Sequence, residues 1–361
     1  DGRIKPCGGA VPPRLLVDFD IPQSLLVAKA NSARMISPSG RNVDMPVGDI
    51  GFVGMVDRDI FDEWLRERAV LDGAERRTGI FEHIERDGTS TQLFYRPRRG
   101  QKLEKVHTKM VIGADGARSK VARQNIDGAD QMKCVFAYHE VIKSPPANDL
   151  GFNPARCDVF YQGKLSPDFY AWIFPHGQTS SIGLGSANKG FPLRETVAEM
   201  RNELGLDLCE TVRKEGAPIP LKPLKRWDNG RDVLVAGDAA GVVAPASGEG
   251  IYYAMICGQI AAETANEFVL NGKVSTLKKA RKRFMKQHGR VFWILGVMQH
   301  FWYSSDKRRE RFVDMCNDQD VQQLTWQAYM NKKLVRARPL AHIKIFLKDT
   351  AHLLGLRPVA R

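Results

Sequence analysis

The chain has 361 residues, 43% hydrophobic and 26% charged, which is enough to bury a core and to form two domains. No apolar run approaches the roughly 18 residues that span a bilayer, and the chain opens on Asp1 without a leader-like segment, so we expect a cytoplasmic protein. Six cysteines with neither paired nor metal-ligand spacing predict free thiols and no metal site.

The net charge of +13 lies almost wholly in the C-terminal quarter. From Lys273 onward the chain holds 20 basic and 6 acidic residues, whereas the rest holds 34 and 35. A basic run at 278–283 precedes apolar runs at 291–298 and 301–303. This pattern suits a helix on an anionic membrane surface, and a solvated helix face is an equally good interpretation. No motif supports nucleic-acid binding.

Periodicity predicts the order of the elements along the chain. Apolar spacing at 57–69, with Ile60, Phe61, Trp64 and Leu65 on one face, indicates a helix. Further helices are expected at 193–204, 251–270 and from 276 onward, and an extended segment at 218–223. Alternating patterns predict strands, and those from 134 onward an antiparallel sheet inserted between two α/β segments. The expected strands are 78–86, 91–95, 106–112, 134–138, 158–161, 169–174, 181–184 and 233–236.

The segment from Val233 to Ile251 is the most informative part of the sequence. Its strand ends at Gly237-Asp238, and a glycine-rich turn leads to a helix that begins near Gly250. A carboxylate beside a helix N-terminus can hold a polyhydroxyl chain and stabilise an anion. We interpret it as a flavin site, with Asp238 accepting hydrogen bonds from the ribityl chain and the helix start facing the flavin ring. The alternative is an ordinary strand–turn–helix with an aspartate cap.

A second strand ends in Gly113-Ala-Asp115-Gly116, where Asp115 could bind a ribose or a pyrophosphate-linked group and Gly116 allows close backbone approach. This segment and Gly237-Asp238 resemble two fingerprints of flavoprotein hydroxylases of the p-hydroxybenzoate hydroxylase fold. The G-x-G-x-x-G of that fold is absent, since Gly183-Leu-Gly185 lacks the third glycine. We expect that the first β–α–β unit precedes the position where this chain begins.

Two further motifs are similar to those of geranylgeranyl reductases, of the phototroph type. They are Lys5-Pro-Cys-Gly-Gly-Ala10 and Tyr170-Ala-Trp-Ile-Phe-Pro175. At period two, Tyr170, Trp172 and Phe174 point to one face of a strand, where aromatic rings can line a slot for an isoprenoid chain. The alternative for these rings is an ordinary sheet core.

The resemblance implies an α/β fold: a Rossmann-like three-layer FAD-binding domain, truncated at its N-terminus, with an inserted antiparallel-sheet substrate domain and a helical C-terminal region. We expect the FAD-binding domain at residues 1–32, 54–125 and 225–270. The substrate domain is expected at 33–53 and 126–224, and the basic helical region at 271–361.

The implied activity is that of an FAD-dependent reductase, with NADPH as donor, that saturates the C=C bonds of a geranylgeranyl group to give phytyl in chlorophyll or bacteriochlorophyll biosynthesis. Geranylgeranyl diphosphate and the pigment ester stay open as substrates, as do reduced ferredoxin as the donor and peripheral binding to the photosynthetic membrane. The alternatives are an archaeal-type isoprenoid lipid reductase, an aromatic hydroxylase of the same fold, and a flavin-less, membrane-associated isoprenoid-binding protein.

The site residues follow from the matched motifs. Cys7 is the candidate catalytic group, assisting proton delivery, with a small packing residue as the alternative. His176 is expected to be a turn residue. The implied cofactor contacts are Cys7, Gly8, Gly9, Ala10, Arg58, Asp115, Gly116, Gly237, Asp238, Gly248, Gly250 and Ile251. The implied substrate contacts are Tyr170, Trp172, Phe174, Pro175 and Tyr252.

Overall fold

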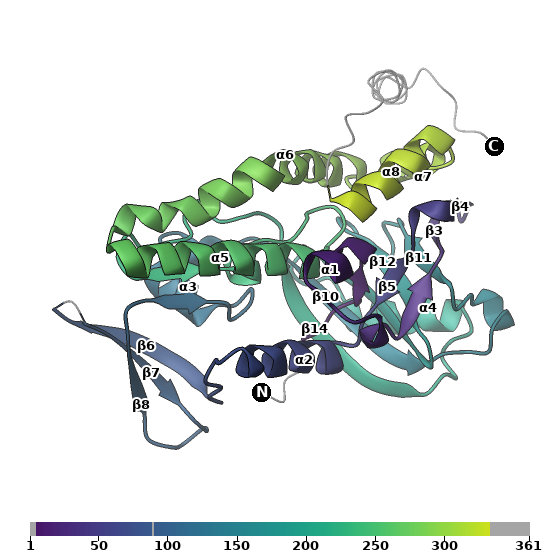
Figure 1. Cartoon of the computed structure of the whole chain (residues 1–361). Helices are drawn as coiled ribbons and strands as arrows, with labels where there is room; N and C mark the ends of the chain where they lie inside the picture. Colours follow the sequence, from purple (N-terminus) through teal and green to yellow (C-terminus); the bar gives the residue numbers. More distant parts are fainter. Residues whose placement is uncertain (1–4, 89, 333–361) are drawn as a thin grey trace. The chain divides into compact units, whose positions relative to one another are not determined.

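The computed structural model describes residues 5–88 and 90–332 (Figure 1). The chain forms two compact units, and we describe each by itself. The sheet unit comprises residues 5–61, 135–217 and 297–332, and the helix unit comprises residues 62–134 and 218–296. These units differ from the predicted domains at several segments. Residues 5–32, 54–61 and 297–332 belong to the sheet unit, and residues 126–134, 218–224 and 271–296 belong to the helix unit.

A seven-stranded sheet is the centre of the sheet unit, with the strand order β14–β10–β13–β12–β11–β3–β4. Its strands are β3 (Ser32–Ile36), β4 (Asn42–Pro46), β10 (Cys134–Lys143), β11 (Arg156–Phe160), β12 (Ala171–His176), β13 (Thr179–Ser186) and β14 (Thr211–Pro220). The run β10–β13–β12–β11 is antiparallel, as predicted. The additional strand β3 pairs with β11 in parallel, so the seven-stranded sheet as a whole is mixed.

The two faces of this sheet differ in chemistry. One face packs against α4 (Leu193–Glu203), where the predicted helix is confirmed. That apolar core includes Tyr138, Ile142, Ala171, Ile173, Ile182, Leu184, Val197 and Met200. Because strand side chains alternate, the intervening residues His139, Trp172 and Ser181 belong to the opposite face. The functional features of the sheet unit lie on this second face.

A smaller sheet, in the order β1–β5–β2, positions the N-terminal motif. Its strands are β1 (Ala10–Val11), β2 (Ala28–Ala30) and β5 (Val53–Met55), and the short α1 (Pro13–Asp18) follows β1. Val56 N donates to Gly9 O at 3.0 Å, so the pairing with β5 continues into the segment before β1. Residues 7–9, which we call the Cys7 loop, are therefore fixed at the edge of this sheet. The remaining helices of the unit are α7 (Asp306–Met315) and α8 (Gln319–Asn331).

The helix unit pairs β15 (Val233–Val235) in parallel with β9 (Val111–Gly113). A separate sheet contains β6 (Ile80–Asp87), β7 (Ser90–Arg96) and β8 (Glu104–Thr108). The prediction of one strand over 106–112 was wrong. Thr108 Oγ1 donates to Met110 O and accepts from Met110 N, and this local turn separates β8 from β9.

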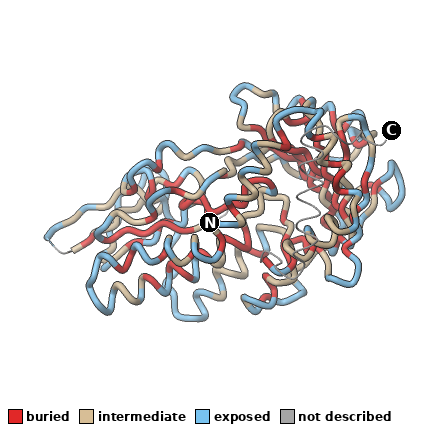
Figure 2. The backbone as a smooth tube through the Cα atoms, turned by 90° about the horizontal axis from the view of Figure 1, so that it is seen from above, coloured by how far each residue is buried: buried red, intermediate tan, exposed pale blue. Residues whose placement is uncertain are grey.

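The long helices confirm most of the helix predictions. They are α2 (Arg58–Leu71), α5 (Ile251–Asn271) and α6 (Lys278–Trp302), with the short α3 (Lys120–Asn125) after β9. In α2 the expected apolar face is narrower than predicted, since Phe61 is buried and Ile60 is 54% exposed. Rings of Tyr253, Phe284 and Phe292 join α5 to α6. Buried residues, red in Figure 2, form long stretches within the units.

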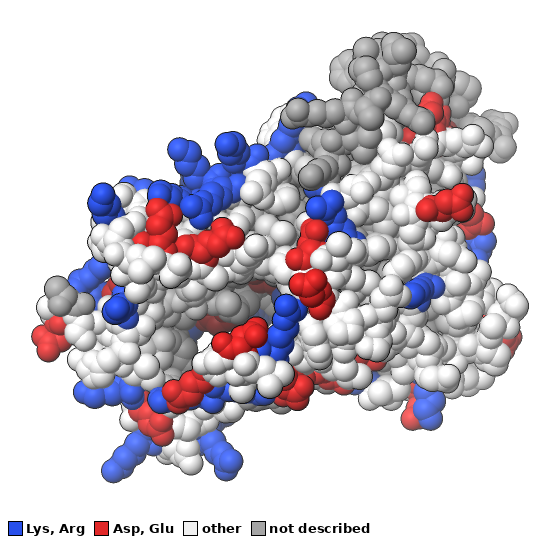
Figure 3. All heavy atoms as spheres, viewed as in Figure 1, with Lys and Arg blue, Asp and Glu red and all other residues white. Residues whose placement is uncertain are grey.

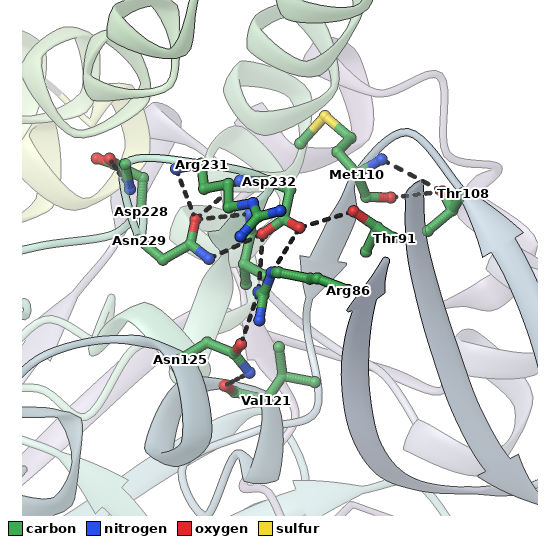
Figure 4. Close-up of polar contacts among 12 residues, drawn as sticks. Arg86, Thr91, Thr108, Met110, Val121, Asn125, Asp228, Asn229, Arg231 and Asp232 are labelled. Carbon is green, nitrogen blue, oxygen red and sulfur yellow. Dashed lines mark hydrogen bonds and ion pairs between the residues drawn. The ribbon is translucent and has the colours of Figure 1, made fainter. Parts of the chain in front are cut away.

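Asp232 fixes the strand β15 to the β6–β7 hairpin (Figure 4). Arg86 donates to both of its oxygens at 2.8 Å, Thr91 Oγ1 donates at 2.7 Å and Asn229 Nδ2 at 2.9 Å. Burial alone would raise the pKa of Asp232, but the hydrogen bonds outweigh it and lower that pKa to about 2. This cluster is a structural cross-link of the helix unit.

The described residues hold neither a membrane-spanning helix nor a group of metal ligands. No helix within the described ranges is both long enough and apolar enough to cross a bilayer. Among residues 5–88 and 90–332, no three His, Cys, Asp or Glu side chains are grouped as metal ligands. The part of the basic C-terminal region at 333–361 lies outside the described residues.

Candidate functional site

The loop after β15 has the geometry expected of an anion-accepting helix start. Gly237, Gly241 and Gly248 have φ values of +59°, +79° and +65°, which favour glycine. The N-cap residue of α5 is Gly250, which has no side chain to cap the first turn. A Cβ placed on Gly250 would lie 3.7 Å from Asp238 Oδ1, so the buried carboxylate lies beside the helix N-terminus. The structure thus brings together Gly237, Asp238, Gly250 and Ile251.

These residues fit the flavin that the sequence predicts. The Asp238 carboxylate can accept hydrogen bonds, as a ribityl chain requires, and the N-cap residue Gly250 has no side chain that could cap the N–H groups of the first turn of α5. Glycine at position 250 also keeps the space beside Asp238 free of a side chain. Burial raises the pKa of the Cys134 thiol, and the nearby negative charge of Asp238 raises it further. Sequence reasoning did not place Cys134 near this loop.

Asp115 has a structural task in the same unit. Its Oδ2 accepts from Lys120 N at 2.7 Å and from Val121 N at 3.2 Å, and Ser119 Oγ donates to Oδ1. The carboxylate therefore caps α3. The adjacent Gly116 has φ of +84°. The contact of Asp115 and Gly116 with a cofactor stays a prediction.

In the sheet unit, the Cys7 loop lies directly on the aromatic residues of β12. A Cβ on Gly8 would lie 2.9 Å from the Phe174 ring and 3.9 Å from Trp172 Nε1. A Cβ on Gly9, whose φ is +71°, would lie 2.5 Å from His176 Cε1 and 2.5 Å from Val56 O. Neither position accepts a larger residue, so both glycines are required by contact. The two sequence motifs meet here, although more than 160 residues separate them.

The rings of β12 share one face, as the alternation predicts. The centroids of Tyr170 and Trp172 are 5.9 Å apart, and those of Trp172 and Phe174 are 6.1 Å apart. Tyr170 and Trp172 are buried. Because Gly8 covers the ring of Phe174, this end of the aromatic face supports the Cys7 loop. A contact of these rings and of Pro175 with substrate stays a prediction.

His176 has a larger role than the turn residue expected from the sequence. Its Nε2 lies 3.0 Å from Gly8 O, and its Nδ1 lies 2.9 Å from Asp57 Oδ1. A carbonyl and a carboxylate only accept, so each ring nitrogen of His176 faces a hydrogen-bond acceptor. The hydrogen bond from His176 lowers the pKa of Asp57. This pair ties the Cys7 loop to the start of α2, and only the fold shows it.

A polar hollow adjoins the Cys7 loop within the sheet unit, and we call it the Cys7 pocket. Cys7, His176 and Ser181 line it. Its charged lining residues are Lys5, Asp57, Arg58, Arg213 and Glu215. Cys7 and Arg58, predicted separately from two motifs, therefore line the same pocket. Arg213, Glu215 and Ser181 were not predicted, because no local motif marks them.

Tyr252 and Tyr253 follow the start of α5 and are both buried. Tyr253 packs edge-on against His288 and Phe292 of α6, so its ring belongs to the packing between the two helices. Burial raises the pKa of Tyr253 well above its ordinary value. Tyr252 contacts the ring of Tyr253 at 5.7 Å, and its predicted contact with substrate stays a prediction.

Comparison with known proteins assigns the family. The chain is 56% identical over 357 residues to a geranylgeranyl diphosphate reductase of Rhodobacter capsulatus, covering 99% of this chain and 90% of that protein. The chain belongs to the geranylgeranyl diphosphate reductase family. Another member, from Synechocystis sp., is 35% identical over 98% of this chain and 89% of its own length. A scan against family models found no match.

The structure agrees with the fold of this geranylgeranyl diphosphate reductase family. A crystal structure of a geranylgeranyl bacteriochlorophyll reductase-like protein from Thermoplasma acidophilum superposes with a TM-score of 0.78. That match covers 93% of this chain and 89% of the other, at 20% identity. The predicted α/β fold class, with its inserted sheet and C-terminal helices, is confirmed.

Proposed function

We propose that this protein is an FAD-dependent reductase that saturates the C=C bonds of a geranylgeranyl group. The observation that carries the proposal is the seating of the Cys7 loop on the rings of Trp172 and Phe174. It joins the two motifs that resemble the geranylgeranyl reductases into one site. The 56% identity to the Rhodobacter capsulatus reductase supports the same activity.

The cofactor contacts are proposed residue by residue. Asp238 and the first turn of α5 would hold the ribityl chain and the electron-rich edge of the ring, as their geometry permits. Arg58, Asp115 and Gly116 are the further proposed contacts. When bound, FAD reduced by NADPH supplies the hydride that saturates the C=C bond.

The residues of the chain would position the alkene, exclude water from it and supply a proton. An isolated alkene is not electrophilic, so placing it accurately and excluding water matter more than polarising it. The buried rings of Tyr170 and Trp172, together with Phe174, Pro175 and Tyr252, are the proposed contacts of the isoprenoid chain. We propose that the Cys7 Sγ holds the proton that each saturated double bond requires. His176 fixes the loop that carries this thiol.

Mass spectrometry tests the activity. The full-length protein, loaded with FAD, is incubated with NADPH and either geranylgeranyl diphosphate or a geranylgeranyl pigment ester. Successive gains of two hydrogens are expected, and the substrate that gains them identifies the acceptor. Oxygen consumption with no saturated product would contradict the reductase and would favour an aromatic hydroxylase. A full-length protein that cannot be loaded with FAD would exclude both enzymes.

We also propose peripheral contact of α6 with an anionic membrane surface, such as the photosynthetic membrane. Lys278, Lys282, Lys286, Arg290 and Trp293 are exposed and follow one another at helical spacing. Figure 3 shows Lys and Arg gathered in the region of α6. By contrast, Glu267 pairs with Lys279 and Arg283, so acidic residues neutralise only part of the helix. Basic helices with an exposed Trp suit such surfaces.

Vesicle sedimentation tests this contact. Binding to vesicles that contain phosphatidylglycerol is expected, with little binding to pure phosphatidylcholine, because each surface Lys or Arg contributes about 1 kcal/mol near an anionic bilayer. The double variant Lys282→Gln, Lys286→Gln should bind less. The matched control Lys102→Gln, Lys105→Gln changes exposed lysines of the β7–β8 region. Equal binding of both variants and the parent protein would contradict the proposed contact.

A further inference from the structure

A buried histidine on β10 connects two lining residues of the Cys7 pocket. His139 is only 2% exposed. Its Nδ1 lies 2.9 Å from Ser181 Oγ on β13, and its Nε2 lies 3.1 Å from Glu215 Oε2 on β14. Trp172 Nε1 donates to the same Ser181 Oγ at 3.1 Å. Ser181 and Glu215 line the pocket, whereas His139 lies behind them.

Counting donors and acceptors gives this cluster two states. When His139 is neutral with Nε2–H donating to Glu215, its Nδ1 accepts the hydroxyl hydrogen of Ser181. When His139 is an imidazolium, Nδ1–H donates to Ser181 Oγ, which already accepts from Trp172. Both lone pairs of the hydroxyl are then occupied, so its hydrogen must point to another acceptor. The protonation of His139 therefore turns the Ser181 hydroxyl toward or away from the pocket that it lines.

We propose that Glu215, His139 and Ser181 form a proton relay, the His139 relay, that returns a proton to Cys7. This inference rests on the proposed function, in which the Cys7 thiol gives one proton for each C=C bond saturated. The Ser181 O–H bond breaks as its proton passes to the Cys7 thiolate, and an S–H bond forms. The Nδ1–H bond of His139 breaks as that proton restores the Ser181 hydroxyl. Both steps are proton transfers, so no atom is oxidised or reduced.

The carboxylate of Glu215 makes the charged state of His139 accessible. Burial alone would raise the pKa of Glu215, but hydrogen bonds and charges from His139 and Arg213 outweigh it and lower that pKa. Glu215 therefore stays ionised beside the ring and balances the imidazolium. Lys5, Arg58 and the Asp57–His176 pair line the same pocket as Ser181 and Glu215. His139 regains its proton through Ser181, which lines the pocket: the hydroxyl hydrogen returns to Nδ1 as Ser181 Oγ takes a proton from solvent.

The test compares neighbouring serines in the FAD-loaded, full-length protein. Ser181→Ala removes the relay hydroxyl, and Ser180→Ala removes a hydroxyl that bonds Ser144 at 2.8 Å instead. We expect Ser181→Ala to lower kcat by about 100-fold, in the range for lost general acid catalysis. We expect Ser180→Ala to stay within about twofold, since Ser180 has no part in the relay. Equal rates for the two variants would overturn the proposal.

A second measurement does not depend on turnover. The Trp172 indole N–H signal, assigned with Trp172→Phe, should move with pH as His139 titrates and turns the Ser181 hydroxyl. The movement should disappear in Ser181→Ala and shift to lower pH in Glu215→Gln, which keeps an acceptor but loses the charge. A Trp172 signal that ignores pH in the parent protein would overturn the relay. If the parent protein forms no saturated product while this signal titrates, the proposed function fails and the relay's two states stand.

Discussion

His176 lines the Cys7 pocket and His139 lies behind two of its lining residues, yet both have nearly the same first partner. Each ring has one nitrogen on a carboxylate, Asp57 at 2.9 Å or Glu215 at 3.1 Å. The second partner differs, since His176 faces the carbonyl of Gly8 and His139 faces the hydroxyl of Ser181. A carbonyl can only accept, whereas a hydroxyl can donate or accept, so only His139 has a second partner that suits the proposed relay. His176 therefore holds the Cys7 loop in place, whereas His139 is the proposed proton carrier.

The largest expected effect comes from disturbing the contact between the Cys7 loop and His176. Gly9→Ala would place a methyl group 2.5 Å from both His176 Cε1 and Val56 O, at a φ that disfavours alanine. We expect a loss of about 3 kcal/mol in the free energy of unfolding, from overpacking and backbone strain. Urea denaturation measures it. The control is Gly258→Ala, at an exposed position of α5 where no atom lies within 4 Å of the added Cβ. A stable Gly9→Ala protein would contradict the contact.

A smaller effect comes from a carboxylate that has no histidine partner. Asp232 accepts from Arg86, Thr91 and Asn229, and its pKa is lowered to about 2. A depressed carboxyl pKa stabilises the fold above the unfolded value near 3.9, and this stability is lost as the pH falls toward 2. It is worth about 2 kcal/mol at neutral pH. Asp232→Asn should lose it, and denaturation at pH 7 and pH 3 checks that the variant and parent converge in acid.

The smallest expected effect comes from changing Asp57, the carboxylate partner of His176. Asp57→Asn replaces the carboxylate by an amide, so His176 loses its charged hydrogen-bond partner. We expect a loss of about 1 kcal/mol at neutral pH. Because the folded pKa of Asp57 is lowered, first by the hydrogen bond from His176, this contribution is present above about pH 4 and fades as the pH falls. A pH series of denaturation midpoints measures it, and a loss that persists unchanged at pH 3 would contradict the ion pair.

Local patterns predicted the elements that carry their own signals. The alternation at 169–174 correctly placed Tyr170, Trp172 and Phe174 on one face. The glycines after Val233 correctly predicted the turn that leads from β15 into α5. In both cases the information lies within a few residues of the feature.

Contacts that join distant strands could not be predicted in this way. The sequence indicated an extended segment only at 218–223, so β14 (Thr211–Pro220) was incomplete and Glu215 had no place beside His139. His176 reaches the carbonyl of a residue 168 positions earlier, and its own neighbourhood predicts only a turn. Proton chemistry here depends on the strand order β14–β10–β13–β12, which no local spacing encodes.

The parallel pair of β3 and β11 has a consequence for synthesis. Residues 32–36 of β3 can pair with β11 only after residues 156–160 have been synthesised. The last strand of the sheet, β14, is complete only at residue 220. Loop closure over such separations slows folding, so the sheet unit should form late on the ribosome. Until then β3 and β4 have an unpaired edge that can associate with other chains. Ribosome pauses placed before and after residue 220 would therefore change the yield of soluble protein.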